Sequence, residues 1–185
     1  MGLDAFAGML ATKVRGAQGD RVMYKCVLLA FDGTVEGRRA LREGALLARC
    51  CDSQIHLLCV VPETPGLRAA ASSNPSCMAQ QCETYQSVLD FGVERLRDMG
   101  VSPVTSLQIG DPNDIIADYA RQVGADLIVV GHRKQNFLAR WWSGSGGFLV
   151  DTTSCSLLIG RNEISDDEFE AELHKRLGAR TPAHA

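Results

Sequence analysis

The sequence lacks the features of nucleic-acid-binding and membrane-spanning proteins. Its 19 Lys and Arg residues are outnumbered by 22 Asp and Glu residues, so the formal net charge at pH 7 is −3. There is therefore no overall basic field that would attract a phosphate backbone. No apolar run approaches the roughly 20 residues of a membrane-spanning helix, and the N-terminus lacks the regions of a secretion signal. We expect a cytoplasmic protein that binds neither nucleic acid nor membrane.

The common catalytic motifs are also missing. The sequence contains no GxxxxGK[ST] phosphate loop, no HExxH zinc motif and no GxSxG nucleophile turn. We therefore assign no catalytic residue and no metal ligand, and we expect at most a slow ATPase activity that is incidental to signalling. An α/β enzyme acting on a flavin or an adenylated substrate is a third possibility, for which no reactive residue can be named.

The seven cysteines do not form a metal-binding or disulfide pattern. Their number is odd, and no paired CxxC spacing is present. Cys26, Cys59 and Cys155 lie inside apolar, strand-like runs. We expect most of the cysteines to be reduced core residues, since free cysteine is among the most buried residue types. A strained disulfide or a redox sensor at Cys50–Cys51 is the alternative.

Strand and helix signals alternate along the chain. With 185 residues and 45% hydrophobic content, the sequence suits one domain. Apolar patterns predict strands at 23–31, 54–61, 105–109, 127–130 and 155–159, and helices at 35–51, 78–99, 112–123 and 148–153. Residues 62–76 are rich in Pro, Ala and Ser without periodicity, which predicts a surface loop.

This alternation predicts the α/β class, with a single doubly wound parallel sheet of five strands covered by helices on both faces. Ligands of such sheets bind beyond the carboxyl ends of the strands, where the strand order reverses. The residues at those ends are therefore candidate site residues: Asp32, Val60, Gly110 and Gly131. For Asp32, the alternative is a purely local role in an Asx turn before the next helix.

The segment from Asp126 to Gly160 has the pattern of a phosphate site. A buried strand ends at Gly131, and a glycine-serine cluster at 144–147 precedes a short predicted helix. Backbone N–H groups at a helix N-terminus bind anions well. The basic residues Arg133, Lys134 and Arg140 lie between the two glycine positions. A merely flexible loop is the alternative interpretation.

Other polar and aromatic residues have ordinary explanations beside functional ones. His132 could donate a proton near phosphate, but a structural or solvent-facing histidine is the simpler interpretation. His56 lies inside a strand and is expected in the core or at a sheet edge. Trp141 and Trp142 could stack on a base or anchor a protein contact, although at least one is expected to pack under its own loop.

The chain ends extend beyond the predicted sheet. We expect an N-terminal extension at 1–20, a domain at 21–162 and a helical tail at 163–185. The tail begins acidic, ends basic and carries Phe169, Leu173 and Leu177 at helical spacing, which predicts a capped amphipathic helix. Such a helix would pack either on the domain or on a partner.

Over residues 22–160 the chain resembles the universal stress protein family. Nucleotide-binding members carry Gly-x-x-Gly, nine residues, and then Gly-Ser or Gly-Thr. Here Gly131, Gly144 and Ser145 keep that spacing, while Lys134 stands in place of the second glycine. The strand ends at Asp32-Gly33 and Val60-Val61, the turn at 110–112 and the closing CSLLI at 155–159 are also similar to the family.

The resemblance implies a Rossmann-like sheet in the order 3-2-1-4-5, a homodimer formed through the last strand, and an adenine nucleotide (ATP, ADP or AMP) with or without Mg²⁺. It further implies that Asp32 contacts the adenosine, that Val60 lines the adenine pocket, and that the backbone of Gly131, Gly144 and Ser145 holds the phosphates. Lys134 either fills the space left by the missing glycine or pairs with a phosphate through its ammonium group.

Two functions from different classes follow. The first is a dimeric, adenine-nucleotide-binding regulatory module of the stress response, whose partners recognise its liganded state. The second is an interaction protein with a vestigial pocket, which recruits partners through the tryptophan loop or the tail. The first predicts that nucleotide copurifies with the protein, and the second predicts that no ligand has an effect.

Overall fold

The structure is a computed structural model that describes residues 23–74, 76–132, 155–161, 165, 167–169 and 171. All structural statements below concern these residues. The predicted N-terminal extension, the basic and tryptophan-containing loop and the predicted helix at 148–153 lie outside them. Within the described part, no helix has the length and apolar character needed to cross a bilayer.

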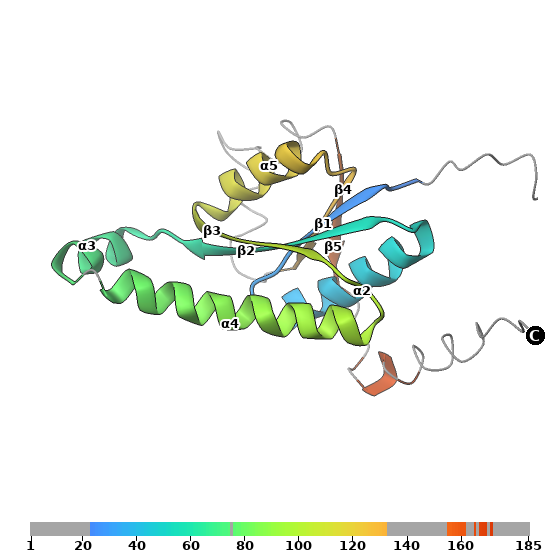
Figure 1. Ribbon diagram of the computed structural model, residues 1–185, viewed down its shortest axis with the longest axis horizontal. Helices are drawn as coiled ribbons and strands as arrows, with labels where there is room; N and C mark the ends of the chain where they lie inside the picture. The colour runs from blue at the N-terminus through green and yellow to red at the C-terminus, as the bar shows by residue number, and fades with distance from the viewer. Residues whose placement is uncertain are drawn as a thin grey trace, which may run out of the picture.

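The described strands form one parallel sheet (Figure 1). They are β1 (Cys26–Ala30), β2 (Gln54–Pro62), β3 (Val104–Gly110), β4 (Leu127–Gly131) and β5 (Ser156–Gly160). The order is β3-β2-β1-β4-β5, and every neighbouring pair is parallel. The predicted fold class and strand order are confirmed.

Helices cover both faces of the sheet. Helices α2 (Val35–Cys51) and α4 (Ser76–Asp98) pack on one face, and α5 (Pro112–Val123) packs on the other (Figure 1). Side chains of a strand alternate between faces. Val27 and Leu29 of β1 accordingly belong to the core under α2 and α4, and Leu28 belongs to the core under α5.

The helix ends follow the predicted caps. Thr34 Oγ1 accepts a hydrogen bond from Gly37 N at 3.0 Å at the start of α2. Asp111 Oδ1 accepts one from Asn113 N at 2.9 Å before α5, whose first residue is proline. Helix α5 ends at Gly124, where φ is +64°. These contacts satisfy N–H groups that the first turn leaves unpaired, which explains why the sequence located both helices well.

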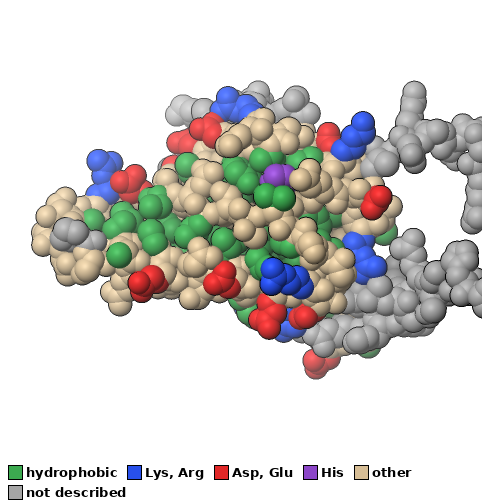
Figure 2. Space-filling view, viewed as in Figure 1, with side chains coloured by type: hydrophobic (Ala, Val, Ile, Leu, Met, Phe, Trp, Pro, Cys, Tyr) green, Lys and Arg blue, Asp and Glu red, His purple; other side chains and the backbone are tan. Residues whose placement is uncertain are grey.

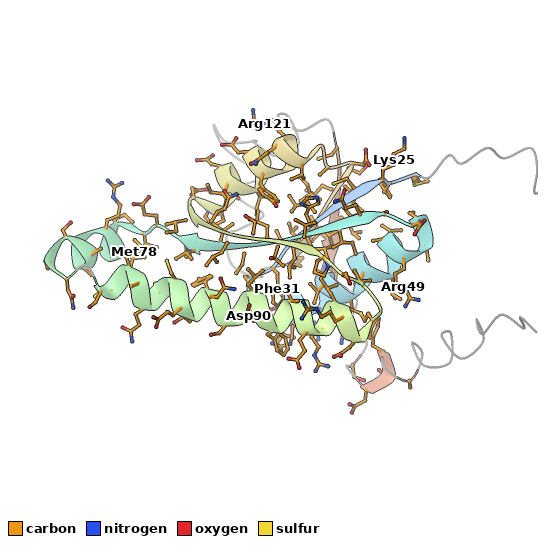
Figure 3. All side chains as sticks on the ribbon, in the orientation of Figure 1. Lys25, Phe31, Arg49, Met78, Asp90 and Arg121 are labelled. Carbon is orange, nitrogen blue, oxygen red and sulfur yellow. The ribbon has the colours of Figure 1, made fainter. Side chains whose placement is uncertain are left out.

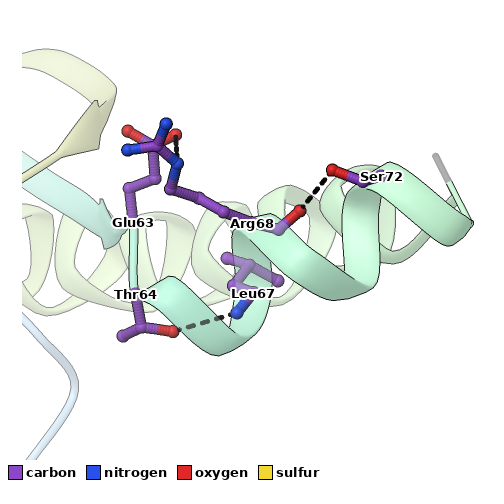
Figure 4. A network of polar contacts seen from close by, with 5 residues as sticks. All are labelled: Glu63, Thr64, Leu67, Arg68 and Ser72. Carbon is purple, nitrogen blue, oxygen red and sulfur yellow. Dashed lines mark hydrogen bonds and ion pairs between the residues drawn. The ribbon is translucent and has the colours of Figure 1, made fainter.

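The prediction of a loop at 62–76 is wrong, because this segment contains helix α3 (Pro65–Ser73). Thr64 Oγ1 accepts a hydrogen bond from Leu67 N at 3.2 Å, and Ser72 Oγ donates one to the Arg68 carbonyl at 2.9 Å (Figure 4). No residue of α3 is buried, so the sequence carries no apolar stripe that would have marked a helix. The Thr64-Pro65 cap was the signal that could have found it.

Helix α3 packs beside the first part of α4, and together they extend away from the sheet (Figure 1). We call α3 and residues 76–84 of α4 the helical arm. The buried residues of α4 are Leu89, Gly92 and Leu96, all in its second half. The fully buried contacts of α4 are therefore all in that second half.

The beginning of the C-terminal tail packs on the domain. Ser165 N donates to Glu168 Oε2 at 3.1 Å, and Glu168 N donates to Ser165 Oγ at 3.2 Å, which is a capping box. Phe169 is buried in the α2 side of the core, and the Arg42 guanidinium carbon lies 5.1 Å from the centre of its ring. The tail helix was expected to pack either on the domain or on a partner. Phe169, in the described part of the tail, packs on the domain.

The cysteines are all present as free thiols, including Cys50 and Cys51. Only Cys26 and Cys59 are buried, so the prediction that most of them are core residues is wrong. The side chains of the arm are exposed or half-buried, which explains why Cys77 and Cys82 are not in the core. Burial, together with the negative charge of Asp32, raises the pKa of Cys59 to about 12, so this thiol stays protonated.

Candidate functional site

A cavity of about 100 Å³ lies at the carboxyl ends of β1, β2 and β4. The chain runs from β1 to β2 and β3 on one side of the sheet, and then crosses to β4 and β5 on the other. The strand order therefore reverses between β1 and β4, which is where doubly wound sheets bind their ligands. The cavity lies at this point of reversal.

The floor and one wall of the cavity are apolar. Ala30, Leu58 and Val130 reach it from the sheet face that α5 covers, and Pro112 and Ile116 reach it from α5 itself. Small or β-branched side chains at the ends of the strands leave room between the sheet and the start of α5. Such a surface suits a flat, weakly polar ring, with specificity supplied by polar groups at its edge.

Asp32 supplies the carboxylate on the rim. It lies two residues beyond the end of β1, and its Oδ1 accepts hydrogen bonds from Thr34 N at 3.0 Å and from Thr34 Oγ1 at 2.6 Å. Among the described residues, Asp32 is the only acidic one that lines the cavity, and no described Lys, Arg or His lines it. The Asx-turn role and a ligand-binding role are therefore compatible, because the turn that holds Asp32 also keeps it at the cavity.

Gly131 lines the cavity at the end of β4 and also contacts the first turn of α2. A Cβ atom at this position would lie 2.6 Å from Gly37 N and 2.8 Å from Glu36 O. Gly160 at the end of β5 has a similar place, since its Cβ would lie 2.5 Å from Ala40 Cα. Both strand ends must therefore be glycine for α2 to pack closely, which is a structural reason that the sequence interpretation of Gly131 missed.

The other predicted site residues have different places. Val60 lines the cavity from β2, and its predicted contact with adenine stays a prediction. Gly110 does not line it; its φ is +154°, and a Cβ atom there would lie 2.9 Å from Ile115 Cγ1. Lys134, Gly144 and Ser145 lie outside the described residues, so their predicted contacts with phosphate stay predictions.

Both predicted structural histidines are described. His56 is buried, as expected, and its Nδ1 lies 3.3 Å from the hydroxyl of Tyr119. Burial lowers the pKa of His56 below its usual value. His132 is half-buried, and its backbone N–H donates to the Gly160 carbonyl at 3.4 Å. Neither histidine lines the cavity.

Sequence reasoning missed the aromatic side of the cavity. Tyr85 of α4 and Phe31 at the end of β1 both line it. The Phe31 ring stacks on Phe91 of α4, with centroids 6.4 Å apart and planes at 15°, and Figure 3 shows Phe31 between the sheet and α4. Tyr85 belongs to the same helical pattern as the core residues of α4, so its spacing alone could not separate a cavity wall from packing.

The fold is that of a doubly wound α/β protein with a cavity at its switch point. The profile of the universal stress protein family matches residues 23–159. The chain belongs to this family.

Known relatives agree with this assignment. A putative universal stress protein of Staphylococcus epidermidis is 27% identical over 156 residues, which cover 82% of this chain and 93% of the relative. Among solved structures, a universal stress protein in complex with cAMP has a TM-score of 0.57 and 18% identity, covering 75% of this chain and 97% of its own. The universal stress protein of Archaeoglobus fulgidus in complex with dAMP has a TM-score of 0.56 and 18% identity, covering 75% and 98%.

Proposed function

We propose that this protein is a regulatory module that binds an adenine nucleotide in the cavity at the ends of β1, β2 and β4. The observation that carries the proposal is that Asp32, Val60 and Gly131, three residues at or just beyond the carboxyl ends of different strands, line the same cavity. The adenine ring would lie on the apolar floor beside Val60. The ribose hydroxyls would donate hydrogen bonds to Asp32, and the phosphates would extend from the cavity past Gly131.

The fit of an adenosine to this cavity is supported by its chemistry. An apolar floor with one carboxylate on the rim matches a flat base joined to a sugar that has hydrogen-bond donors. The solved relatives named above hold cAMP and dAMP, which share the adenine base on a furanose sugar phosphate. The proposal therefore specifies the base and the sugar, and it includes ATP, with or without Mg²⁺, as one of the nucleotides to be tested.

The direct test is to denature freshly purified protein and analyse the supernatant for ATP, ADP and AMP. Melting curves with ATP, AMP and cAMP follow, because a ligand at 100 times its Kd stabilises the folded state by about 2.7 kcal/mol. We expect bound nucleotide or a clear rise in Tm. No released nucleotide and no shift at millimolar concentrations would contradict the proposal and favour an interaction protein with a vestigial pocket.

Asp32→Asn sharpens the test. The amide oxygen can still accept from Thr34, so the turn is kept, but the negative charge at the cavity is lost. We expect binding to weaken by about tenfold, the loss of one charge-assisted hydrogen bond. Asp52→Asn is the matched control, because Asp52 is exposed at the end of α2 and does not line the cavity.

Lys134 gives a second test of the same proposal. If the glycine of the family motif is what the phosphates need, Lys134→Gly should bind nucleotide more tightly. If the ammonium group contacts a phosphate, the same change should weaken binding of ATP more than binding of adenosine. An affinity that does not change with either ligand would remove Lys134 from the site.

The wider role that we propose is cytoplasmic and belongs to the stress response, with two copies of the chain joined through β5. Strand β5 is at one edge of the described sheet and has a neighbour only on its β4 side. Such an edge presents backbone N–H and C=O groups that a second copy can pair with.

A further inference from the structure

Residues on both sides of the helical arm line the cavity. Pro62 is the last residue of β2, and Tyr85 follows the arm on α4, and both line the cavity. The chain therefore leaves the sheet at the cavity, runs out along α3, and returns along α4 to the cavity again. Both attachment points of the arm touch the space in which the proposed ligand would lie.

The arm itself has few strong contacts with the domain. No residue of α3 is buried, and every buried residue of α4 follows Tyr85 in the sequence. At the base of the arm, Glu63 N donates to the Gly110 carbonyl at 3.1 Å. Such a segment opens locally at a lower free energy than the core does.

Most polar contacts of the arm join residues within the arm or at its base, and they are exposed to solvent. The Arg68 Nε lies 3.7 Å from Glu63 Oε1, with side chains 70% and 42% exposed, and exposed pairs of this kind contribute little (Figure 4). Apolar side chains are visible along the arm and continue onto the body of the molecule (Figure 2). Met78 is a residue of the arm (Figure 3). Leu67 and Met78 are half-buried, so packing between α3 and α4 holds the arm together.

Tyr85 is the residue that can connect the ligand to the arm. Its half-buried ring packs against the α2 and α4 side of the core and also lines the cavity. A ligand in the cavity would contact the Tyr85 ring only while this part of α4 stays packed against the core. Since a ligand shifts a conformational equilibrium by its differential contacts with the two states, binding would make local opening of the arm less frequent.

We propose that nucleotide in the cavity stabilises the helical arm through Tyr85, so that the arm opens locally less often when the ligand is bound. This inference rests on the function proposed above. It assigns a ligand contact to α4, the helix that continues into the most extended part of the described molecule (Figure 1). A partner that binds the arm could therefore distinguish the liganded state without contacting the cavity.

The experiment is hydrogen exchange of the full chain with and without millimolar AMP, and in parallel with millimolar ATP. The peptides to compare cover the arm at 63–84 and the cavity at 30–34 and 58–62. We expect exchange in the arm to slow by about fivefold, the size expected for one aromatic contact. General stabilisation does not produce this slowing, because the arm exchanges by local opening.

Tyr85→Ala removes the contact, and Tyr24→Ala is the matched control. Tyr24 is also half-buried against the same core but does not line the cavity. In Tyr85→Ala, saturating nucleotide should still protect the cavity peptides while the arm no longer responds. In Tyr24→Ala, both should respond as in the natural sequence. If Tyr85→Ala does not fold, Tyr85→Leu keeps an apolar side chain without the ring and should give the same loss.

The outcomes separate this inference from the function on which it rests. Protection of the cavity with an unchanged arm overturns the inference and leaves nucleotide binding intact. Equal slowing of the arm in the natural sequence and in the Tyr85 variants overturns the role of Tyr85. No protection in any peptide, with either nucleotide, overturns the proposed function and this inference with it.

Discussion

At the scale of single residues, the site combines packing demands with ligand-binding ones. Gly131 lines the cavity and also lets β4 approach the backbone of α2. Asp32 holds a turn and stays on the cavity rim. A loss of binding after substitution at such a position has two possible causes, so stability has to be measured beside affinity.

Gly131→Ala should destabilise the protein by about 2–4 kcal/mol, because the new Cβ would lie 2.6 Å from Gly37 N and the backbone would have to move. Urea unfolding measures this loss. Gly66→Ala is the control, since a Cβ there meets nothing within 4 Å and alanine favours helix α3. Equal stability of the two variants would show that the close packing of β4 on α2 is not required.

His56 should make stability depend on pH. Its pKa in the folded state is lowered from 6.5 by burial, so the unfolded state binds more protons below that value. The free energy of unfolding should therefore be fully present above about pH 6.5 and should fall as the pH drops from there toward the folded-state pKa. Urea unfolding from pH 7.5 to 5 measures the slope.

His56→Gln should flatten this pH dependence, because glutamine does not titrate. The variant can be less stable at every pH, since the contact with the Tyr119 hydroxyl changes, so the slope is the informative quantity. A variant that keeps the slope of the natural sequence would assign the pH dependence to another group.

At the scale of elements, the sequence predicted the helices that have a buried apolar face and a side chain that caps the N-terminus. Helices α2 and α5 were located well because Thr34 and Asp111 cap them and one face of each is buried. Helix α3 was missed because none of its residues is buried, so no periodicity exists. Asp32 and Val60 could be found from their places at strand ends, whereas Tyr85 could not be distinguished from the packing residues of its helix.

Phe169→Ala tests how strongly the tail holds to the domain. Phe169 is only 8% exposed and lies under the Arg42 guanidinium, so we expect a loss of about 2–3 kcal/mol in the free energy of unfolding. Phe91→Ala makes the same chemical change at a side chain that is 37% exposed and should cost about 1 kcal/mol. A smaller loss for Phe169 than for Phe91 would show that the tail is not part of the core.

At the scale of the whole molecule, the alternating strand and helix pattern was enough to predict the parallel sheet, and the family resemblance added the order of its strands. The position of the cavity followed from that order, since it lies where the order reverses. Assembly could not be derived in the same way, because an edge strand shows where a second copy can pair but not that it does.

The proposed dimer predicts a mass of about twice 20.0 kDa by light scattering. Ser156→Lys places a charge at an exposed position of β5 and should weaken association by about tenfold, since lysine on an edge strand opposes pairing. Thr105→Lys is the matched control on the opposite edge, β3, where Thr105 is also exposed. A monomeric mass for the natural sequence, or equal effects of both variants, would contradict a dimer through β5.

The pairing of β1 with both β2 and β4 also determines when the site can exist during synthesis. Val27 has Ile55 as its partner on one side and Leu127 on the other. The first partner leaves the ribosome soon after β1, whereas the second appears only after most of the chain has been made. One half of the sheet can therefore assemble on the nascent chain, while the cavity has to wait for Val130 and Gly131. A nucleotide that binds there would select chains whose synthesis has passed β4.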